Sequence, residues 1–163
     1  MDFKTAICII TYKREKELIS CINSVIRQKC NFKFDIVIVD NNNKSELKKN
    51  IEELNRNNDI NIKYYIESKK GIPNARNKCI NIVKDKYKYL VFIDDDEIAF
   101  ETTWLKSMIE SIEKFKCDVV SGPVLADYKS KKNTFLNKKV FFNRRKRHKT
   151  GTKLKNCATN NMI

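Results

Sequence analysis

The sequence has little that could build a zinc site. Its only histidine is His148, and its six cysteines include no Cys-x-x-Cys pair. Structural zinc is normally held by four Cys and His ligands at short, regular spacings, so the sequence argues against this class of metal centre. We interpret the cysteines as reduced thiols that mostly serve packing.

Long apolar runs are also absent. No segment approaches the roughly 20 apolar residues of a membrane-spanning helix. Residues Met1–Lys4 lack the basic start and apolar stretch of a signal peptide, so we expect the chain to stay in the cytoplasm. With 163 residues, 41% of them hydrophobic, the chain is long enough for one domain with a sizeable core and too short for two ordinary domains.

Acidic residues are missing after Asp127. The segment from Lys129 to Ile163 carries 12 Lys and Arg residues, while residues 1–128 hold the other 22 basic groups and all 20 acidic groups. Most of the formal net charge of +14 therefore belongs to the C-terminal segment. Such a segment suits phosphates, anionic lipid head groups or nucleic acid, and it is equally compatible with a solvated lysine-rich surface.

The most informative stretch that is present is Leu90–Glu97, where four apolar residues precede four acids. The unbroken apolar run predicts a strand covered on both faces, as in the middle of a parallel sheet. The acids then lie at its carboxyl end, where open α/β sheets bind ligands. Asp94 and Asp96 offer the hard oxygen ligands that Mg²⁺ or Mn²⁺ accepts, and a cation would relieve their repulsion. A solvated acidic turn is the simpler alternative.

Strand and helix patterns alternate along residues 1–128 and predict a mostly parallel sheet flanked by helices. Strands are expected at Thr5–Thr11, Phe34–Val39, Ile60–Ile66 (as an edge strand), Leu90–Ile93 and Asp118–Ser121. Helices are expected at Glu15–Gln28, from a capping box of Asn43 and Glu46 to Asn57, from Pro73 onward with Cys79, Ile80 and Val83 facing inward, and at Trp104–Phe115.

Polar residues follow the first two expected strands. Thr11 and Tyr12 end the first strand, with Arg14 in the turn that follows, and Asp40 and Asn41 end the second. Carboxyl ends of parallel strands share one edge of the sheet, so these groups are candidates for the same ligand site as the acids.

A helix start supplies further candidates. Gly71 permits an unusual turn and Pro73 suits a first helical position, which places Asn74 and Arg76 in the opening turn. A helix start that bears Arg and Asn can neutralise an anion, although an exposed surface arginine is as good an interpretation on spacing alone.

Four motifs in this order resemble the inverting family 2 glycosyltransferases. They are Ile10–Arg14, Ile38–Asn41, Gly71–Asn77 and Asp94–Asp96, and the resemblance covers nearly the whole chain. It implies a single α/β domain with the Rossmann-like GT-A fold, with residues 1–128 as the nucleotide-sugar-binding core. Residues 129–163 would be the start of an acceptor-binding part in a chain that is truncated at its C-terminus.

The resemblance also implies a role for each polar residue. Tyr12 would lie near the base, and Asp40 would offer a carboxylate acceptor to the nucleoside. Asp94 would reach the ribose side, and Asp96 would bind Mn²⁺ or Mg²⁺ between two phosphates, with Asp94 as the second metal ligand. Asp95 would point away from that site. Arg76 would support the diphosphate or orient the acids. The residues implied to bind the nucleotide-sugar are Thr11, Tyr12, Arg14, Asp40, Asn41, Asn74, Arg76, Asp94 and Asp95.

The implied reaction moves a sugar from a nucleoside-diphosphate sugar, with uridine diphosphate (UDP) as the first choice, to an acceptor hydroxyl. A metal would stabilise the leaving diphosphate, and a base would deprotonate the acceptor. In the family that base lies beyond a segment resembling Ala158–Met162. We therefore expect this chain to bind the donor without efficient turnover. The acceptor stays open between a carbohydrate, a lipid-linked molecule and a protein, and the basic segment could contact anionic lipid at the inner face of the membrane.

Two other classes of function stay open. A non-catalytic sensor or remnant would bind a nucleotide-sugar in the same pocket and would need no base. A nucleic-acid-binding protein is supported only by the basic run Asn143–Lys149, with no recognised motif, so we expect no nucleic acid partner.

Overall fold

The computed structural model describes residues 4–42, 47–57, 59–125, 148–157 and 159–163. Strands and helices alternate along the chain, as the sequence predicted. In chain order they are β1 (Thr5–Thr11), α1 (Glu15–Ile26), β2 (Phe34–Asp40), α2 (Leu47–Arg56), β3 (Ile62–Ile66), α3 (Ile72–Val83), β4 (Tyr89–Asp94) and α4 (Trp104–Phe115). Within the described ranges, none of these helices is long and apolar enough to cross a membrane.

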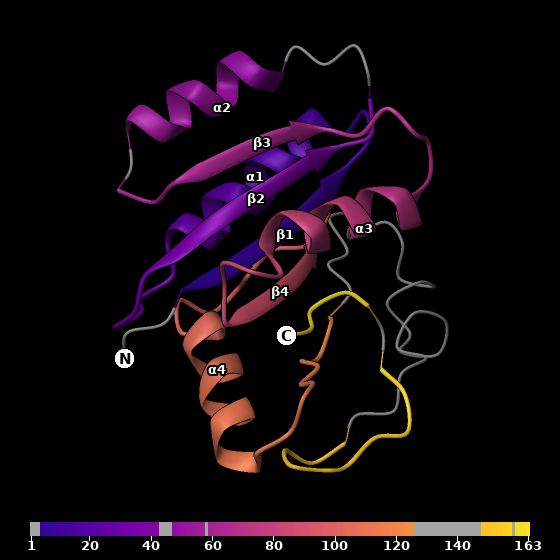
Figure 1. Ribbon diagram of the computed structural model, residues 1–163. Helices are drawn as coiled ribbons and strands as arrows, with labels where there is room; N and C mark the ends of the chain where they lie inside the picture. The colour runs from indigo at the N-terminus through magenta and orange to yellow at the C-terminus, as the bar shows by residue number, and fades with distance from the viewer. Residues whose placement is uncertain (1–3, 43–46, 58, 126–147, 158) are drawn as a thin grey trace, which may run out of the picture.

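The four strands form one sheet in the order β3-β2-β1-β4, and every neighbouring pair is parallel (Figure 1). The edge position predicted for β3 is confirmed. The central position expected for β4 is wrong, because β4 is the last regular strand on its side. Its outer side is covered instead by an antiparallel bridge between Phe92 and Met162. An unbroken apolar run in the sequence therefore indicates that a strand is buried, but not whether regular strands flank it on both sides.

Helices cover both faces of the sheet. Side chains alternate along β1, so that Ile7 and Ile9 pack with α1, α2 and α4 on one face, while Ala6 and Cys8 pack with α3 on the other. This arrangement confirms the predicted parallel sheet flanked by helices. It also leaves the carboxyl ends of all four strands at one edge of the sheet.

The inward face of α3 differs from the prediction at one position. Ala75, Cys79 and Val83 are buried, whereas Ile80 is 38% exposed. The buried residues follow one another at intervals of four, so they share one side of the helix, and Ile80 lies about 100° away from Cys79 around the axis.

The strand expected at Asp118–Ser121 does not form. Ser121 makes a single antiparallel bridge to Met162, with Gly122 N donating to Asn161 O at 2.9 Å. The pairing is too short for a regular strand. Gly122 suits this close approach, because a Cβ there would lie 2.6 Å from Asn161 Nδ2.

Some expectations fall on residues outside the described ranges. These are the capping box of Asn43 and Glu46 and most of the basic segment, including residues 129–147. The six cysteines are all free, and Cys8, Cys21 and Cys79 are buried. A hydrogen bond with Cys79 and burial raise the pKa of Cys8, and burial raises the pKa of Cys21, so both stay protonated as packing residues.

Candidate active site

The carboxyl ends of β1 and β4 bring the first strand motif to the acidic turn. The two strands are paired with Ile10 opposite Asp94, so Thr11 and Asp95 meet just beyond the register. Thr11 Oγ1 donates a hydrogen bond to Asp95 Oδ2 at 2.8 Å, and both side chains are buried. Asp95 is therefore held inside the protein against β1.

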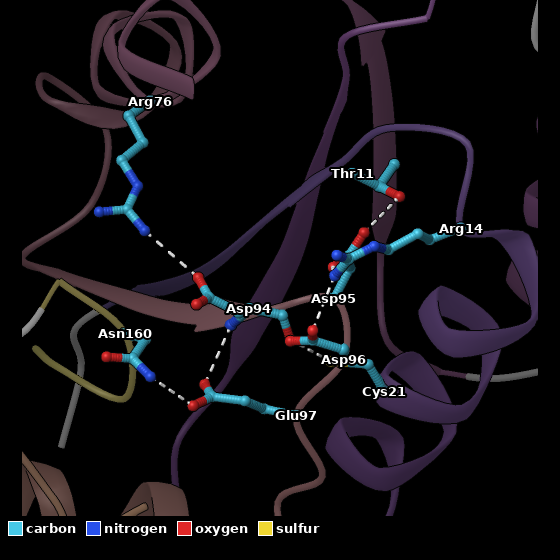
Figure 2. A network of polar contacts seen from close by, with 9 residues as sticks. All are labelled: Thr11, Arg14, Cys21, Arg76, Asp94, Asp95, Asp96, Glu97 and Asn160. Carbon is cyan, nitrogen blue, oxygen red and sulfur yellow. Dashed lines mark hydrogen bonds and ion pairs between the residues drawn. The ribbon is translucent and has the colours of Figure 1, made fainter. Parts of the chain in front are cut away.

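Arg14, directly before α1, joins two of the acids. Its Nη1 lies 2.7 Å from Asp96 Oδ2 and 3.3 Å from Asp95 Oδ1. The charges of Asp95 and then Asp96 raise the pKa of Arg14. Asp95 was expected to point away from the site of its neighbours; its side chain turns inward to Thr11, and Arg14 also links it to Asp96 (Figure 2).

Arg76, in the first turns of α3, holds the third acid. Its Nη2 lies 3.2 Å from Asp94 Oδ1, and its guanidinium carbon lies 5.4 Å from the centre of the Phe92 ring. Only 19% of the Arg76 side chain is exposed. Arg76 thus reaches the acidic turn from the opposite side to Arg14, as Figure 2 shows, and it orients Asp94.

The acids are only partly neutralised by the two arginines. Burial raises the pKa of Asp94; the charge of Arg76 offsets part of this effect, and that of Asp96 adds to it. Burial also raises the pKa of Asp95, against the hydrogen bond from Thr11 and the charge of Arg14. The two arginines therefore do not fully offset the cost of burying these carboxylates.

Glu97 also belongs to this site, although its residue pattern predicted no role for it. Its Oε2 accepts a hydrogen bond from Asp94 N at 3.1 Å, and its Oε1 accepts one from Asn160 Nδ2 at 2.6 Å. Burial raises the pKa of Glu97, while these two hydrogen bonds lower it in part. Asn160 lies 63 residues further along the chain, so no local spacing could have revealed the pair.

The residues that end β2 lie beside this site but are engaged by the protein itself. The Asp40 carboxylate is fully buried; Oδ1 accepts from Asn42 N at 2.8 Å and Oδ2 from Tyr64 Oη at 2.7 Å. This carboxylate, which we expected to be an acceptor for the nucleoside, therefore already has two donors within the protein. Asn41 bonds to the backbone of the loop between β3 and α3, at Glu67, Lys69 and Gly71.

Two further candidates lie at the surface of the same edge. Tyr12 is 45% exposed, and Lys13 Nζ lies 5.3 Å from the centre of its ring. Asn74 Nδ2 donates to Lys70 O at 2.8 Å in the turn that begins α3. The structure therefore joins Thr11, Arg14, Arg76 and the three aspartates by direct contacts, and leaves the other candidates around them.

The acids fit a divalent cation that a ligand shares. The Asp94 and Asp96 side chains are 42% and 52% exposed and present hard oxygen atoms. Within the described ranges, no group of three or more His, Cys, Asp or Glu residues is placed to hold a metal by itself. Mg²⁺ is commonly held by one or two carboxylates together with substrate phosphates and water, which matches this donor set.

Sequence comparison decides the family. The family described as "Glycosyl transferase family 2" matches residues 6–163, almost the entire chain. The chain belongs to glycosyl transferase family 2. No curated protein sequence matches this family 2 chain.

Solved structures with the same architecture agree with the family. The crystal structure of S. aureus TarS 1-349 in complex with UDP has a TM-score of 0.59 and 25% identity, over 76% of this chain and 38% of that one. The mannosyltransferase PcManGT from Pyrobaculum calidifontis, in complex with GDP-Man and Mn²⁺, has a TM-score of 0.66 and 13% identity, over 77% of this chain and 36% of that one. The GT-A fold predicted from the motifs is thereby confirmed. The family 2 chain covers less than two fifths of the length of either structure.

Proposed function

We propose that this family 2 chain forms the donor-binding part of a glycosyltransferase and binds a nucleoside-diphosphate sugar at its acidic turn. The observation that carries the proposal is the turn Asp94–Asp96, held between Arg14 and Arg76 at the carboxyl edge of the parallel sheet. Such an edge is where open α/β sheets bind nucleotides. Support comes from the ligands of the similar structures, which are UDP and UDP-GlcNAc in TarS and GDP-Man with Mn²⁺ in PcManGT.

Each charged residue has a task in this proposal. Asp94 and Asp96 would hold Mn²⁺ or Mg²⁺, which when bound stabilises the negative charge of the leaving diphosphate. Arg76 is fixed by its contacts with Asp94 and Phe92, so it supplies a preorganised positive charge beside the phosphates. Arg14 is half-exposed and can donate to a phosphate oxygen as well as to Asp96.

The nucleoside would lie over the end of β1. Tyr12 follows Thr11 there and exposes part of its ring, which suits stacking against a base. We propose uridine as that base. Asp40 and Asn41 act indirectly, because they hold the backbone that borders this region.

The acceptor step needs a general base if the transfer inverts the sugar. Glu97 directly follows the acidic turn, but both of its carboxylate oxygens already accept hydrogen bonds. We assign no base among the described residues and expect the 163-residue chain to bind the donor better than it turns it over. Binding without transfer would also serve a nucleotide-sugar sensor. A radiolabelled assay separates the two functions, because the transferase should still show slow transfer of the sugar and a sensor should show none.

The test of the donor site is calorimetric titration with UDP in Mn²⁺, in Mg²⁺ and in chelator. We expect binding that requires a divalent cation. Asp96→Asn should weaken binding in Mn²⁺ by about tenfold or more, equivalent to about 1.4 kcal/mol, and should change little in chelator. Asp85→Asn is the matched control, because Asp85 is exposed in the turn after α3 and loses the same charge. Equal UDP affinity with and without chelator would refute the proposal.

A further inference from the structure

The last residues of the chain lie along the outer side of β4, near the point marked C in Figure 1. Phe92 N donates to Met162 O at 2.8 Å, and Met162 N donates to Phe92 O at 3.2 Å. The chain bends just before this bridge, at Asn161 with a φ of 48°, and the preceding Asn160 contacts Glu97 beside the acidic turn. Residues 159–163 therefore reach the donor site from the side opposite β1.

This segment is anchored by contacts that do not involve the Asn160 side chain. Asn161 Oδ1 accepts from Trp104 Nε1 at 2.7 Å, and Asn161 Nδ2 donates to Pro123 O at 2.9 Å. Ile163 is buried and exchanges backbone hydrogen bonds with Val120. These contacts do not depend on the Asn160 side chain, so they should hold residues 161–163 in place when Asn160 is substituted.

The Asn160 side chain instead serves Glu97. Its Nδ2 donates to Glu97 Oε1 at 2.6 Å, and Glu97 Oε2 accepts from the backbone N of Asp94 at 3.1 Å (Figure 2). Glu97 N also donates to Asp94 O at 3.0 Å, which closes the turn. Without Asn160 the Glu97 carboxylate would face the negative charges of Asp94 and Asp96 with one hydrogen-bond donor fewer. The Glu97 side chain could reduce this repulsion by turning toward solvent.

We propose that Asn160 is a positioning residue of the donor site. Through Glu97 it holds the backbone N–H of Asp94 and so sets the directions in which Asp94 and Asp96 present their carboxylates. The inference rests on the proposed function, because those carboxylates are the groups assigned to the cation and the diphosphate. Outer partners of metal ligands commonly change metal affinity by about tenfold or more when they are removed.

Charge and position can be separated by the choice of variant. Asn160→Ala removes the donor without changing charge. Asn160→Asp adds a negative charge, which by Coulomb attraction alone would strengthen Mn²⁺ binding. A carboxylate at position 160 would, however, repel the Glu97 carboxylate, displace that side chain and so weaken Mn²⁺ binding. The double variant Asn160→Asp with Glu97→Gln exchanges donor and acceptor. The amide nitrogen introduced at position 97 would donate to the carboxylate introduced at position 160, and the amide oxygen would accept from Asp94 N.

The measurements are UDP affinity by calorimetry with Mn²⁺ and with chelator, and amide hydrogen exchange at Asp94 without ligand. We expect Asn160→Ala and Asn160→Asp each to weaken Mn²⁺-dependent UDP binding by about tenfold. The two single variants should also speed amide exchange at Asp94. The double variant should restore the UDP affinity and the exchange rate to within about threefold of the wild type. Asn156→Asp adds the same charge at an exposed position four residues earlier in the sequence. Its UDP affinity and its exchange at Asp94 should match those of the wild type.

Three results would overturn the inference. Single variants with wild-type Mn²⁺-dependent affinity, or with tighter binding for Asn160→Asp, would refute it while leaving the proposed function intact. Equal losses with Mn²⁺ and with chelator would show a general structural effect instead of a positioned metal site. A wild-type chain without metal-dependent UDP binding would refute the proposed function and this inference together.

Discussion

Replacing Asn41 distinguishes a nucleoside contact from a structural one. The Asn41 side chain is buried and makes three hydrogen bonds to the loop between β3 and α3. Its Nδ2 donates to Glu67 O at 2.8 Å and to Lys69 O at 2.9 Å, and its Oδ1 accepts from Gly71 N at 2.7 Å. The loop leads into α3 and hence to Arg76, so a loss at Asn41 should reach the acidic turn indirectly.

The expected size follows from these bonds. A typical intramolecular hydrogen bond contributes about 1 kcal/mol net, so Asn41→Ala should lower the free energy of unfolding by about 3 kcal/mol if all three are lost. Water that reaches the freed carbonyls would reduce this to about 2 kcal/mol. Asn41→Asp keeps the acceptor for Gly71 but turns a carboxylate oxygen toward two carbonyls, so it should be at least as destabilising.

Urea unfolding followed by circular dichroism measures this loss. Asn74→Ala is the control, because among the described residues the Asn74 side chain makes one hydrogen bond, from the start of α3 to Lys70 O in the loop before it. It should cost about 1 kcal/mol or less. The free energy of unfolding of Asn41→Ala could instead lie within about 0.5 kcal/mol of the wild-type value while UDP binding is lost. In that case Asn41 contacts the nucleoside and our structural interpretation is wrong.

Two further predictions concern the base and the pH dependence of stability. UDP should displace a bound uridine nucleotide better than GDP does, because the exposed Tyr12 ring and the end of β1 suit a small pyrimidine; stronger displacement by GDP would contradict this. Burial alone would raise the pKa of Asp35, but hydrogen bonds from Tyr87, Lys63 and Asn61 lower it overall. Asp35 should therefore stabilise the fold above about pH 4, the ordinary range of an unfolded Asp, and lose this contribution as the pH falls through its lowered folded-state pKa. The free energy of unfolding in urea should differ less between about pH 7 and about pH 3 for Asp35→Asn than for the wild type. An equal difference would disprove this role of Asp35.

Much of the fold was predictable because its strands are local apolar runs. Such a run shows that a strand is buried, and parallel pairing then brings polar residues after different strands to one edge. That reasoning placed Thr11 near the acids at Asp94–Asp96, and the helix start placed Arg76 there. These parts of the site depend on parallel pairing and on the place where a helix begins, and the local pattern indicates both.

The remaining parts depend on contacts that the local pattern does not contain. The outer side of β4 is covered by Met162, which a strand's own residues cannot reveal. Nor does a polar residue at a strand end show whether it faces a ligand or its own backbone, and Asp40 and Asn41 turned out to bond within the protein. The pair of Glu97 and Asn160 was missed for the same reason.

The hydrogen bond from Thr11 to Asp95 spans 84 positions of the chain, so the acidic turn takes its shape only when the first and last strands of the sheet have paired. A ligand that binds this turn therefore binds the folded chain and not the unfolded one. At a concentration about one hundred times its dissociation constant it would add about 2.7 kcal/mol to the stability of the whole domain, which corresponds to a rise in melting temperature of roughly 5–10 °C. A panel of nucleoside diphosphates could then be ranked by thermal shift alone, before any acceptor is known.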